Sequence, residues 1–253
     1  MKNLLIGAIS GNYQVSDIEK WVTTSNFPGV HRTLLLYNHT QNPELIKFLQ
    51  QNNIEIILPE FGFSGREQKL FEVNTGKTNI NNSYELVHNL RFLHIYFYLK
   101  DNHFDKVFTT DVKDVYFNSS PFDRVPLEGI IATGEVIKYK EDQWNTNHLI
   151  TNLGVIGLEY LEEEVLNVGV FGGGIKDVKN LCRDVYLMSC GKHRVADQTS
   201  FNHLIRTTYK DKTHLTSIED NYAVHLQVIA SGKVKFNLDN IKNYCIVHQY
   251  DRL

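Results

Sequence analysis

Two carboxylates, Asp111 and Asp114, stand three positions apart directly after the expected strand 104–109. Two carboxylates held close together at the end of a buried strand do not both stay ionised unless a cation or hydrogen-bond donors lie nearby. A divalent metal ion would supply that charge, and it could also bridge the oxygens of a diphosphate. The same spacing fits a simple turn, in which one aspartate caps a helix and the other is solvated. The choice between the two depends on the elements around the pair.

The first 120 residues alternate between short apolar runs and segments with helical periodicity. In the segment 83–100, Leu86, Leu90, Leu93 and Phe97 recur at spacings of three and four, which predicts an amphipathic helix. Apolar strands separated by helices predict an α/β fold with a mostly parallel, Rossmann-like central sheet covered by helices on both faces. We expect strands at 4–9, 32–37, 53–58 and 104–109, and helices at 16–23, 43–51 and 83–100.

The carboxyl ends of these strands form the edge of the sheet at which α/β proteins bind ligands. In this chain the rule brings residues 8–13, 37–38 and 111–114 to one rim. The aspartate pair therefore lies on the predicted ligand side of the sheet. This position strengthens the metal interpretation relative to the turn.

The second half of the chain is less regular. We expect strands at 129–133 and 154–158, with a polar loop at 139–147 between them. The glycine-rich segment 165–174 fits a turn between a strand and a helix, or a place where the backbone approaches a ligand closely. No linker or internal repeat separates the halves, so we expect a single domain over residues 1–253. Helices are expected at 176–190 and from Asp197 onward, and a closing strand at 244–248.

The composition is that of an ordinary globular protein, with 42% hydrophobic residues, 22% charged residues and a formal net charge of -3. Without a basic excess, a nucleic-acid polymer is not expected as a partner. The three cysteines form no CxxC pair, which argues against a disulfide framework or a zinc site. No apolar run is long enough for a transmembrane segment, and the run 4–9 is too short for a signal peptide. We therefore expect a cytoplasmic protein.

Five segments resemble, in order along the chain, the sequence motifs of nucleotide-sugar-dependent glycosyltransferases of the GT-A fold. VFTTDVKDVYF (107–117) is similar to their strand and metal motif, in the variant where two positions separate the acidic residues. LRFLHIYFYLK (90–100) looks like the helix that precedes this motif and carries a basic residue facing the donor. The other three are similar to the donor-sugar segment, the Asp-Gln element and the late histidine motif: LNVGVFGGG (166–174), ADQTSFNHLI (196–205) and IVHQYDR (246–252).

The resemblance implies a GT-A type fold with a smaller mixed region on the acceptor side. Residues 1–118 would form the nucleotide-binding half, and residues 119–253 the half that binds the donor sugar and the acceptor. The implied reaction moves a sugar from a UDP-sugar to a hydroxyl of a glycan or another acceptor. The implied metal ligands are Asp111, Asp114 and His248. An imidazole beside two carboxylates favours Mn²⁺ over Ca²⁺, and Mg²⁺ is also compatible.

Several residues would bind the donor if the resemblance holds. Arg91 sits among apolar neighbours on the predicted helix 83–100, where it could reach the surface or pair with Glu85 or Asp105. The family pattern instead assigns its guanidinium to the donor's phosphate or sugar. Tyr37 is a possible stacking partner for the base. The remaining expected donor-binding residues are Ala8, Ile9, Ser10 and Tyr13 beside the base and ribose, and Asn167, Gly169, Gly173, Gln198 and Lys242 around the sugar and diphosphate.

Asp197 and Glu135 are the candidates for proton transfer. Asp197 opens a predicted helix, so it could simply cap that helix. It could also accept hydrogen bonds from sugar hydroxyls, and in an inverting reaction it would be our first choice of general base, with Glu135 the second. Trp144 and Asn145 are expected in the acceptor wall.

Two other functions remain open from the sequence. A nucleotidyltransferase that makes nucleotide sugars typically has a glycine-rich loop with basic residues after the first strand, and residues 10–14 contain neither Lys nor Arg. A non-catalytic protein that binds carbohydrate or nucleotide on the same fold is the other possibility, although both aspartates of the metal motif are present.

Overall fold

The computed structural model describes residues 1–37, 42–59, 84–190, 192 and 195–253. Its first half is built on four parallel strands, β1 (Asn3–Ser10), β2 (Val30–Tyr37), β3 (Glu55–Ile57) and β4 (Lys106–Thr110), in the order β3-β2-β1-β4. The connecting helices are α1 (Val15–Thr24), α2 (Pro43–Gln51) and α4 (Tyr84–Asp101). The predicted strands and helices of this half are confirmed. The predicted rim residue 38 lies outside the described residues.

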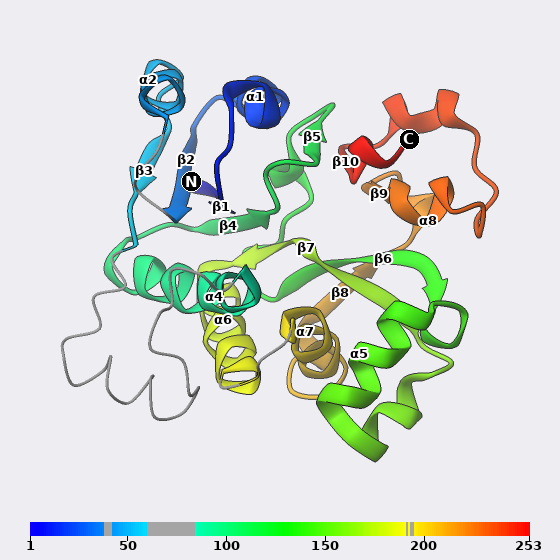
Figure 1. Ribbon diagram of the computed structural model, residues 1–253. Coiled ribbons are helices and arrows are strands. Elements are labelled where there is room, and N and C mark those ends of the chain that lie inside the picture. The colour runs from blue at the N-terminus through cyan, green and yellow to red at the C-terminus, as the bar shows by residue number, and fades with distance from the viewer. Residues whose placement is uncertain (38–41, 60–83, 191, 193–194) are drawn as a thin grey trace.

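The sheet continues beyond β4 with strands from the second half of the chain. Strand β7 (Glu164–Gly174) lies antiparallel to β4 on one side and to β6 (Ile130–Lys138) on the other, and β8 (Thr213–Thr216) pairs with β6 in parallel. The complete order is β3-β2-β1-β4-β7-β6-β8 (Figure 1). The result is an α/β structure with a large, mostly parallel central sheet flanked by helices, as predicted. The helices of this half are α5 (Gln143–Leu153), α6 (Ile175–Ser189) and α7 (Asp197–Arg206).

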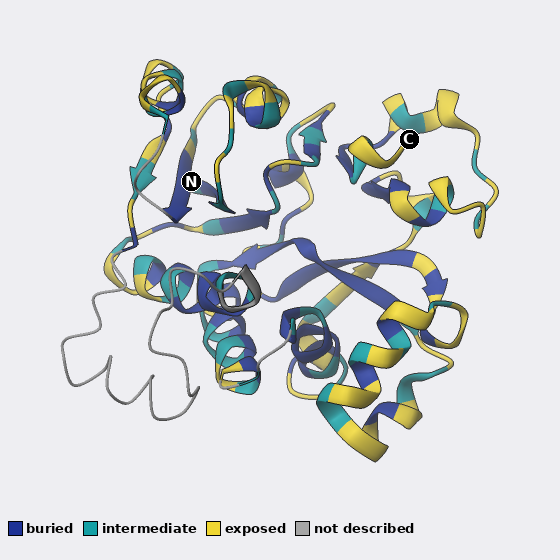
Figure 2. Ribbon diagram, in the orientation of Figure 1, coloured by how far each residue is buried: buried dark blue, intermediate teal, exposed yellow. Residues whose placement is uncertain are grey.

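Helices cover the central sheet on both faces, and each face has its own core. Helices α4, α6 and α7 lie on one side and α1 and α2 on the other (Figure 1). Because successive side chains of a strand point to opposite faces, Leu4 and Ile6 of β1 join the first core, while Leu5 and Ile9 join the second. Figure 2 shows the central strands as the most continuously buried part of the molecule. No helix in the described part of the chain is long and apolar enough to cross a membrane.

A second, smaller sheet stands beside the first at the carboxyl end of β4. Strand β10 (Ile246–His248) lies at its centre, antiparallel to β5 (Val115–Phe117) and parallel to β9 (Ala223–His225). Helix α8 (Leu226–Ala230) follows β9 directly. This sheet joins the segment after β4 to the last residues of the chain. The remaining short elements are 3₁₀ helices at Pro121–Asp123, Tyr139–Glu141, Gly154–Tyr160, Lys210–Lys212, Ile218–Asp220, Leu238–Asn243 and Tyr250–Arg252.

Two predictions for the second half are wrong, and one alternative left open there is excluded. The expected strand 154–158 is a 3₁₀ helix, and its apolar side chains stay outside the core, with Val155 79% exposed. An apolar run of this length does not distinguish a strand from a helical segment. The expected loop 139–147 contains the start of α5, which Asp142 caps by accepting from the backbone N–H of Asn145 at 2.9 Å. Of the two alternatives for the glycine-rich segment 165–174, the turn is excluded, because the segment lies within the buried strand β7.

Candidate functional site

The two sheets bring Asp111, Asp114 and His248 together. Asp111 directly follows β4, and its backbone N–H donates to the carbonyl of Gly169 in β7 at 2.7 Å. Asp114 directly precedes β5. Since β5 and β10 pair with Val115 opposite His248, the histidine at the end of β10 lies beside this turn. Residues that are 134 positions apart or more in the chain thus meet at the predicted ligand rim.

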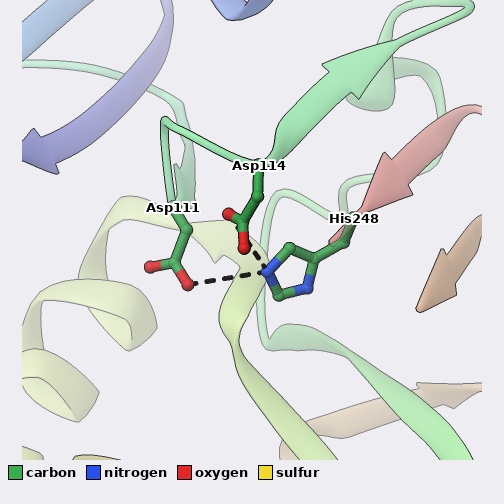
Figure 3. Close-up of side chains that lie close together, drawn as sticks. All are labelled: Asp111, Asp114 and His248. Atoms are coloured by element: carbon green, nitrogen blue, oxygen red, sulfur yellow. Dashed lines mark ion pairs between the residues drawn. The ribbon is translucent and has the colours of Figure 1, made fainter. Parts of the chain in front are cut away.

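The three side chains point toward one another (Figure 3). His248 Nε2 lies 3.6 Å from Asp111 Oδ2 and 3.6 Å from Asp114 Oδ1, which is longer than a hydrogen bond, so these contacts are electrostatic. One ligand atom from each residue lies within 4.8 Å of the other two. His248 is only 2% exposed, and its Nε2 has no hydrogen-bond partner among the described residues.

This geometry fits a divalent metal ion. Metal–oxygen and metal–nitrogen bonds of about 2.0–2.2 Å place neighbouring ligand atoms about 3 Å apart, and the 3.6 Å between His248 Nε2 and each carboxylate is slightly wider than this. A buried nitrogen without a hydrogen-bond partner is costly unless something else occupies its lone pair. Two carboxylates and one imidazole form a donor set that suits Mn²⁺ or Mg²⁺. The predicted metal ligands are therefore brought together in an arrangement that could hold the ion.

Arg91 ties the metal group to Asp197. Its Nη1 donates to Asp111 Oδ1, and its Nη2 donates to Asp197 Oδ2 at 3.1 Å. Arg91 does not reach the surface, since it is 9% exposed, and Asp105 instead accepts from the backbone N–H of Lys2. The side chain of Glu85, the other expected partner, lies outside the described residues. Burial favours protonation of Asp111, but the charges of Arg91 and His248 outweigh it and hold the pKa of this carboxyl well below its usual range.

The pKa values of Asp114 and His248 are both raised, and burial and neighbouring charges explain the changes. Burial raises the pKa of Asp114, and the nearby charges of Asp111 and Asp251 raise it further. For His248, burial lowers the pKa, but Asp111, Asp114 and Glu135 together raise it above its usual value. Without a metal ion, the group therefore has an excess of negative charge that His248 only partly compensates.

A cavity of about 490 Å³ opens beside this group, and most of the other predicted residues line its walls. Glu135 accepts from Asn167 Nδ2 through Oε1 at 2.6 Å, and Asn167 Oδ1 accepts from the backbone N–H of Gly169 at 2.8 Å. Glu135 is 6% exposed, and burial raises the pKa of its carboxyl to about 7. The residues of the predicted set that line the cavity are Arg91, Asp111, Glu135, Trp144, Asn145, Asn167, Gly169, Asp197, Gln198 and His248.

The opposite wall comes from α5 and α7. Gln198 Nε2 donates to Asn145 Oδ1 at 2.8 Å, and the Gln198 side chain also accepts from the backbone N–H of Val168 at 3.4 Å. Asp197 is 2% exposed and lies in the first turn of α7, but the N-cap position belongs to Ala196. Trp144 is 53% exposed, and its ring lies 4.0 Å from that of His148.

Two of the predicted donor-binding residues lie away from this cavity. Gly173 pairs with Val107 and Ile130 in the interior of β7, four residues along the strand from Gly169. A side chain there would collide with the carbonyl of Gly129, so close packing of the strands explains this glycine. Lys242 is exposed in the 3₁₀ helix before β10, whereas His248 lies at the other end of that strand. For both residues, nearness to a motif in sequence did not correspond to nearness in space.

The residues at the end of β1 and β2 also do not line the cavity. Ile9 and Tyr37 are buried in the two cores, and the Tyr37 hydroxyl hydrogen-bonds to His94 Nδ1 at 2.7 Å. The Tyr37 ring, 1% exposed, offers no face for stacking in this structure. Ala8 borders a small void next to Arg91, while Ser10 and Tyr13 are half-buried at the carboxyl end of β1.

Sequence reasoning missed a second histidine at the metal group. His225 Nδ1 lies 3.0 Å from His248 Nδ1, and His225 is 3% exposed. Burial lowers the pKa of His225 well below its usual value, and the neighbouring His248 lowers it further. A signal was present, because Ala223-Val224-His225 and Ile246-Val247-His248 both place a histidine directly after two apolar residues. The two segments are neighbouring parallel strands.

No protein-family model matches this chain, and no curated protein matches it either. The case for a function therefore depends on the side chains that the fold brings together and on their chemistry.

Proposed function

We propose that this protein is a metal-dependent glycosyltransferase of the GT-A type, which moves a sugar from a UDP-sugar to a hydroxyl of an acceptor. The observation that carries the proposal is the group of Asp111, Asp114 and His248, whose buried Nε2 has no hydrogen-bond partner among the described residues and which borders a cavity at the carboxyl end of β4. The central α/β sheet is compatible with nucleotide binding at this rim.

The metal ligands would be Asp111, Asp114 and His248. A bound Mn²⁺ or Mg²⁺ would supply positive charge to a departing diphosphate, which then leaves without being protonated. The excess negative charge of the group favours a cation over an anionic ligand on its own. A nucleoside diphosphate would therefore bind tightly only together with the metal ion.

Arg91 and Asp197 would fix the position of the metal group relative to the cavity in which the donor sugar would bind. Both terminal nitrogens of Arg91 are engaged, one by Asp111 and one by Asp197. A guanidinium that makes two such contacts fixes the orientation of both carboxylates. We therefore assign Arg91 to the positioning of Asp111, rather than to a direct contact with the diphosphate.

Glu135 is better placed than Asp197 to accept the proton of the acceptor hydroxyl in an inverting transfer. Asp197 Oδ2 already accepts from Arg91, and its Oδ1 accepts from the backbone N–H of Gln198 at 2.9 Å. Glu135 borders the cavity, and among the described residues only its Oε1 has a hydrogen-bond partner. With a pKa of about 7, it can gain and lose a proton near neutral pH. A retaining transfer needs no such base.

The acceptor would approach from the side of α5. Trp144 and Asn145 line this part of the cavity, together with Gln227 and Ser231 from the α8 region. An indole offers a flat apolar surface to a sugar ring, and amide and hydroxyl groups can bind its hydroxyls. This wall contains amides, a hydroxyl and one Lys233–Asp142 ion pair, which suits an uncharged acceptor.

The proposal is tested by measuring UDP release from UDP-glucose, UDP-galactose and UDP-xylose, with Mn²⁺ and with EDTA. We expect slow metal-dependent hydrolysis of at least one donor, and a thermal stabilisation by UDP plus Mn²⁺ that neither gives alone. A nucleotidyltransferase would instead form UDP-sugar from UTP and a sugar phosphate. Absence of UDP release together with absence of any thermal shift would rule out the proposed function.

A further inference from the structure

A line of buried hydrogen bonds runs from the metal group into the central sheet. His248 presents Nε2 to the two aspartates, and its Nδ1 lies 3.0 Å from His225 Nδ1. His225 Nε2 lies 3.0 Å from Thr133 Oγ1, which in turn lies 3.3 Å from the carbonyl oxygen of Val170. His225 and Thr133 are 3% and 1% exposed, so water does not replace these partners.

The position of one proton in this line decides the positions of the others. Two ring nitrogens in hydrogen-bond contact share a single proton, and a carbonyl oxygen can only accept. When Nε2 of His248 binds a metal ion, the proton of the neutral ring is on Nδ1. His225 Nδ1 must then accept it, and His225 must donate from Nε2.

The last donor in the line is then the hydroxyl of Thr133. Its oxygen accepts from His225 Nε2, and its own proton goes to the carbonyl of Val170. Every buried polar atom along the line has a partner in this arrangement. Hydrogen bonds to the distal nitrogen of a metal-bound histidine fix its tautomer and orientation, and their loss commonly weakens metal binding.

We propose that Thr133 is a positioning residue for the metal centre, because through His225 it holds the proton of His248 on Nδ1 and leaves Nε2 free to bind a divalent cation. This inference rests on the metal site of the proposed function. It adds two residues, His225 and Thr133, that do not touch the cation themselves.

The metal-free protein depends less on Thr133. Without a cation the line can reverse, so that the Thr133 hydroxyl donates to His225 and Nε2–H of His248 points to the aspartates. When His248 is neutral, the metal-free protein therefore needs no acceptor for a proton on His225 Nε2, whereas the metal-bound state always requires one. Removing the hydroxyl should therefore weaken metal binding more than it destabilises the metal-free fold.

The experiment compares the full chain with three variants, T133V, T133S and T109V, by calorimetric titration with Mn²⁺. We expect the dissociation constant of T133V to rise about tenfold or more, within the range known for partners of metal-bound histidines. T133S keeps a hydroxyl and should bind as the parent does. Thr109 is the matched control, because it is 4% exposed and its hydroxyl donates to the carbonyl of Phe171 at 3.3 Å, without contact to either histidine.

Equal Mn²⁺ affinity of T133V and the parent would overturn the proposal. If T133V does not fold, long-range ¹H–¹⁵N spectra of the histidine-labelled parent loaded with Zn²⁺ decide the matter. We expect the His225 proton on Nε2, and a proton on Nδ1 would contradict the inference. Failure of the metal site itself looks different, since the parent would then bind no Mn²⁺ and the proposed function would fall together with the inference.

Discussion

Strand β7 connects two regions in which aspartate carboxylates have opposite surroundings. Near Gly174, at one end, Asp177 is 5% exposed, and its two oxygens accept from the backbone N–H of Gly129 at 2.8 Å and from Lys212 Nζ at 3.1 Å. Near Gly169, Asp111 and Asp114 face a histidine nitrogen that makes no hydrogen bond among the described residues. The first carboxylate is fully compensated by the protein, and the second pair is not.

The difference separates a structural charge from a candidate binding site. The cavity at the Asp177 end is the larger one, about 650 Å³ against about 490 Å³, so cavity size alone does not indicate the functional edge. What distinguishes the Asp111 end is a buried polar atom, His248 Nε2, that has no hydrogen-bond partner among the described residues. Buried polar atoms are costly to leave without partners, so such atoms point to a ligand.

The largest effect expected from this comparison is on metal binding. Asp114→Asn should lower the affinity for Mn²⁺ by about 100-fold or more, because a neutral amide replaces an anionic ligand. Loss of a residue that only hydrogen-bonds to a metal ligand already lowers metal affinity by about 10–100-fold. The metal-free fold should be unchanged or slightly more stable, since burial and the charges of Asp111 and Asp251 already disfavour the ionised form of Asp114. Calorimetric titration with Mn²⁺ and thermal denaturation in EDTA give the two readouts.

The same substitution at the other end is the control. Asp177→Asn should lower the free energy of unfolding by about 1–3 kcal/mol, because one of its two hydrogen-bond partners loses an acceptor. Lys212 is largely exposed and can turn to solvent, which limits the cost. Mn²⁺ affinity should stay that of the parent. A loss of Mn²⁺ binding in D177N, or none in D114N, would remove the distinction between the two regions.

The parallel half of the sheet could be predicted from the sequence because its signals are local. Leu4–Ile9 is continuously apolar, and the helix after residue 83 repeats leucines at helical spacing. The carboxyl-end rule then placed Asp111 at the carboxyl end of β4, where the structure has it, without knowledge of the pairing. Strand β7 was harder, because glycine is depleted in strands and three glycines in a row favour a turn. Its glycines are explained by neighbours distant in sequence, such as Phe108 and Leu127.

The candidate site depended on contacts that no local pattern contains. His248 was expected from resemblance, but its partner His225 was not, because the pairing of β9 with β10 is set by the packing of the small sheet. Lys242 and Gly173 failed to reach the cavity for the converse reason. Both stand within a few residues of a site residue in sequence. Each residue of an extended strand adds about 3.3 Å of length, so even a few residues lead well away from the cavity.

The next prediction concerns Glu135, a buried carboxylate at the cavity whose one hydrogen-bond partner among the described residues is Asn167. Its pKa rises from 4.5 to about 7 on folding, so between these values the folded state binds the proton more tightly than the unfolded chain does. Stability from this group is therefore present below pH 4.5 and is lost as the pH rises through 7. At about 1.4 kcal/mol per pKa unit, the loss amounts to about 3 kcal/mol by pH 8.

Glu135→Gln should remove this pH dependence while keeping an oxygen that accepts from Asn167. In EDTA, urea denaturation should show E135Q more stable than the parent at pH 8, with a smaller difference at pH 5. An equal difference at both values would mean that Glu135 titrates normally, and would weaken its assignment as the base.

The smallest effects, and the sharpest comparison, come from two glycines of β7. A side chain at Gly169 would meet the carboxylate of Asp111, whereas a side chain at Gly173 would meet the backbone carbonyl of Gly129. A carboxylate can turn aside, so Gly169→Ala should cost little stability but displace a metal ligand and weaken Mn²⁺ binding. The backbone at Gly129 cannot turn aside, so Gly173→Ala should lower the free energy of unfolding by about 1–3 kcal/mol and leave Mn²⁺ affinity unchanged. Both variants are measured by urea denaturation in EDTA and by titration with Mn²⁺. If the two substitutions affected stability and metal binding in the same proportion, the two ends of β7 would not differ in role. The unpartnered His248 Nε2 near Gly169 would then no longer identify the candidate site.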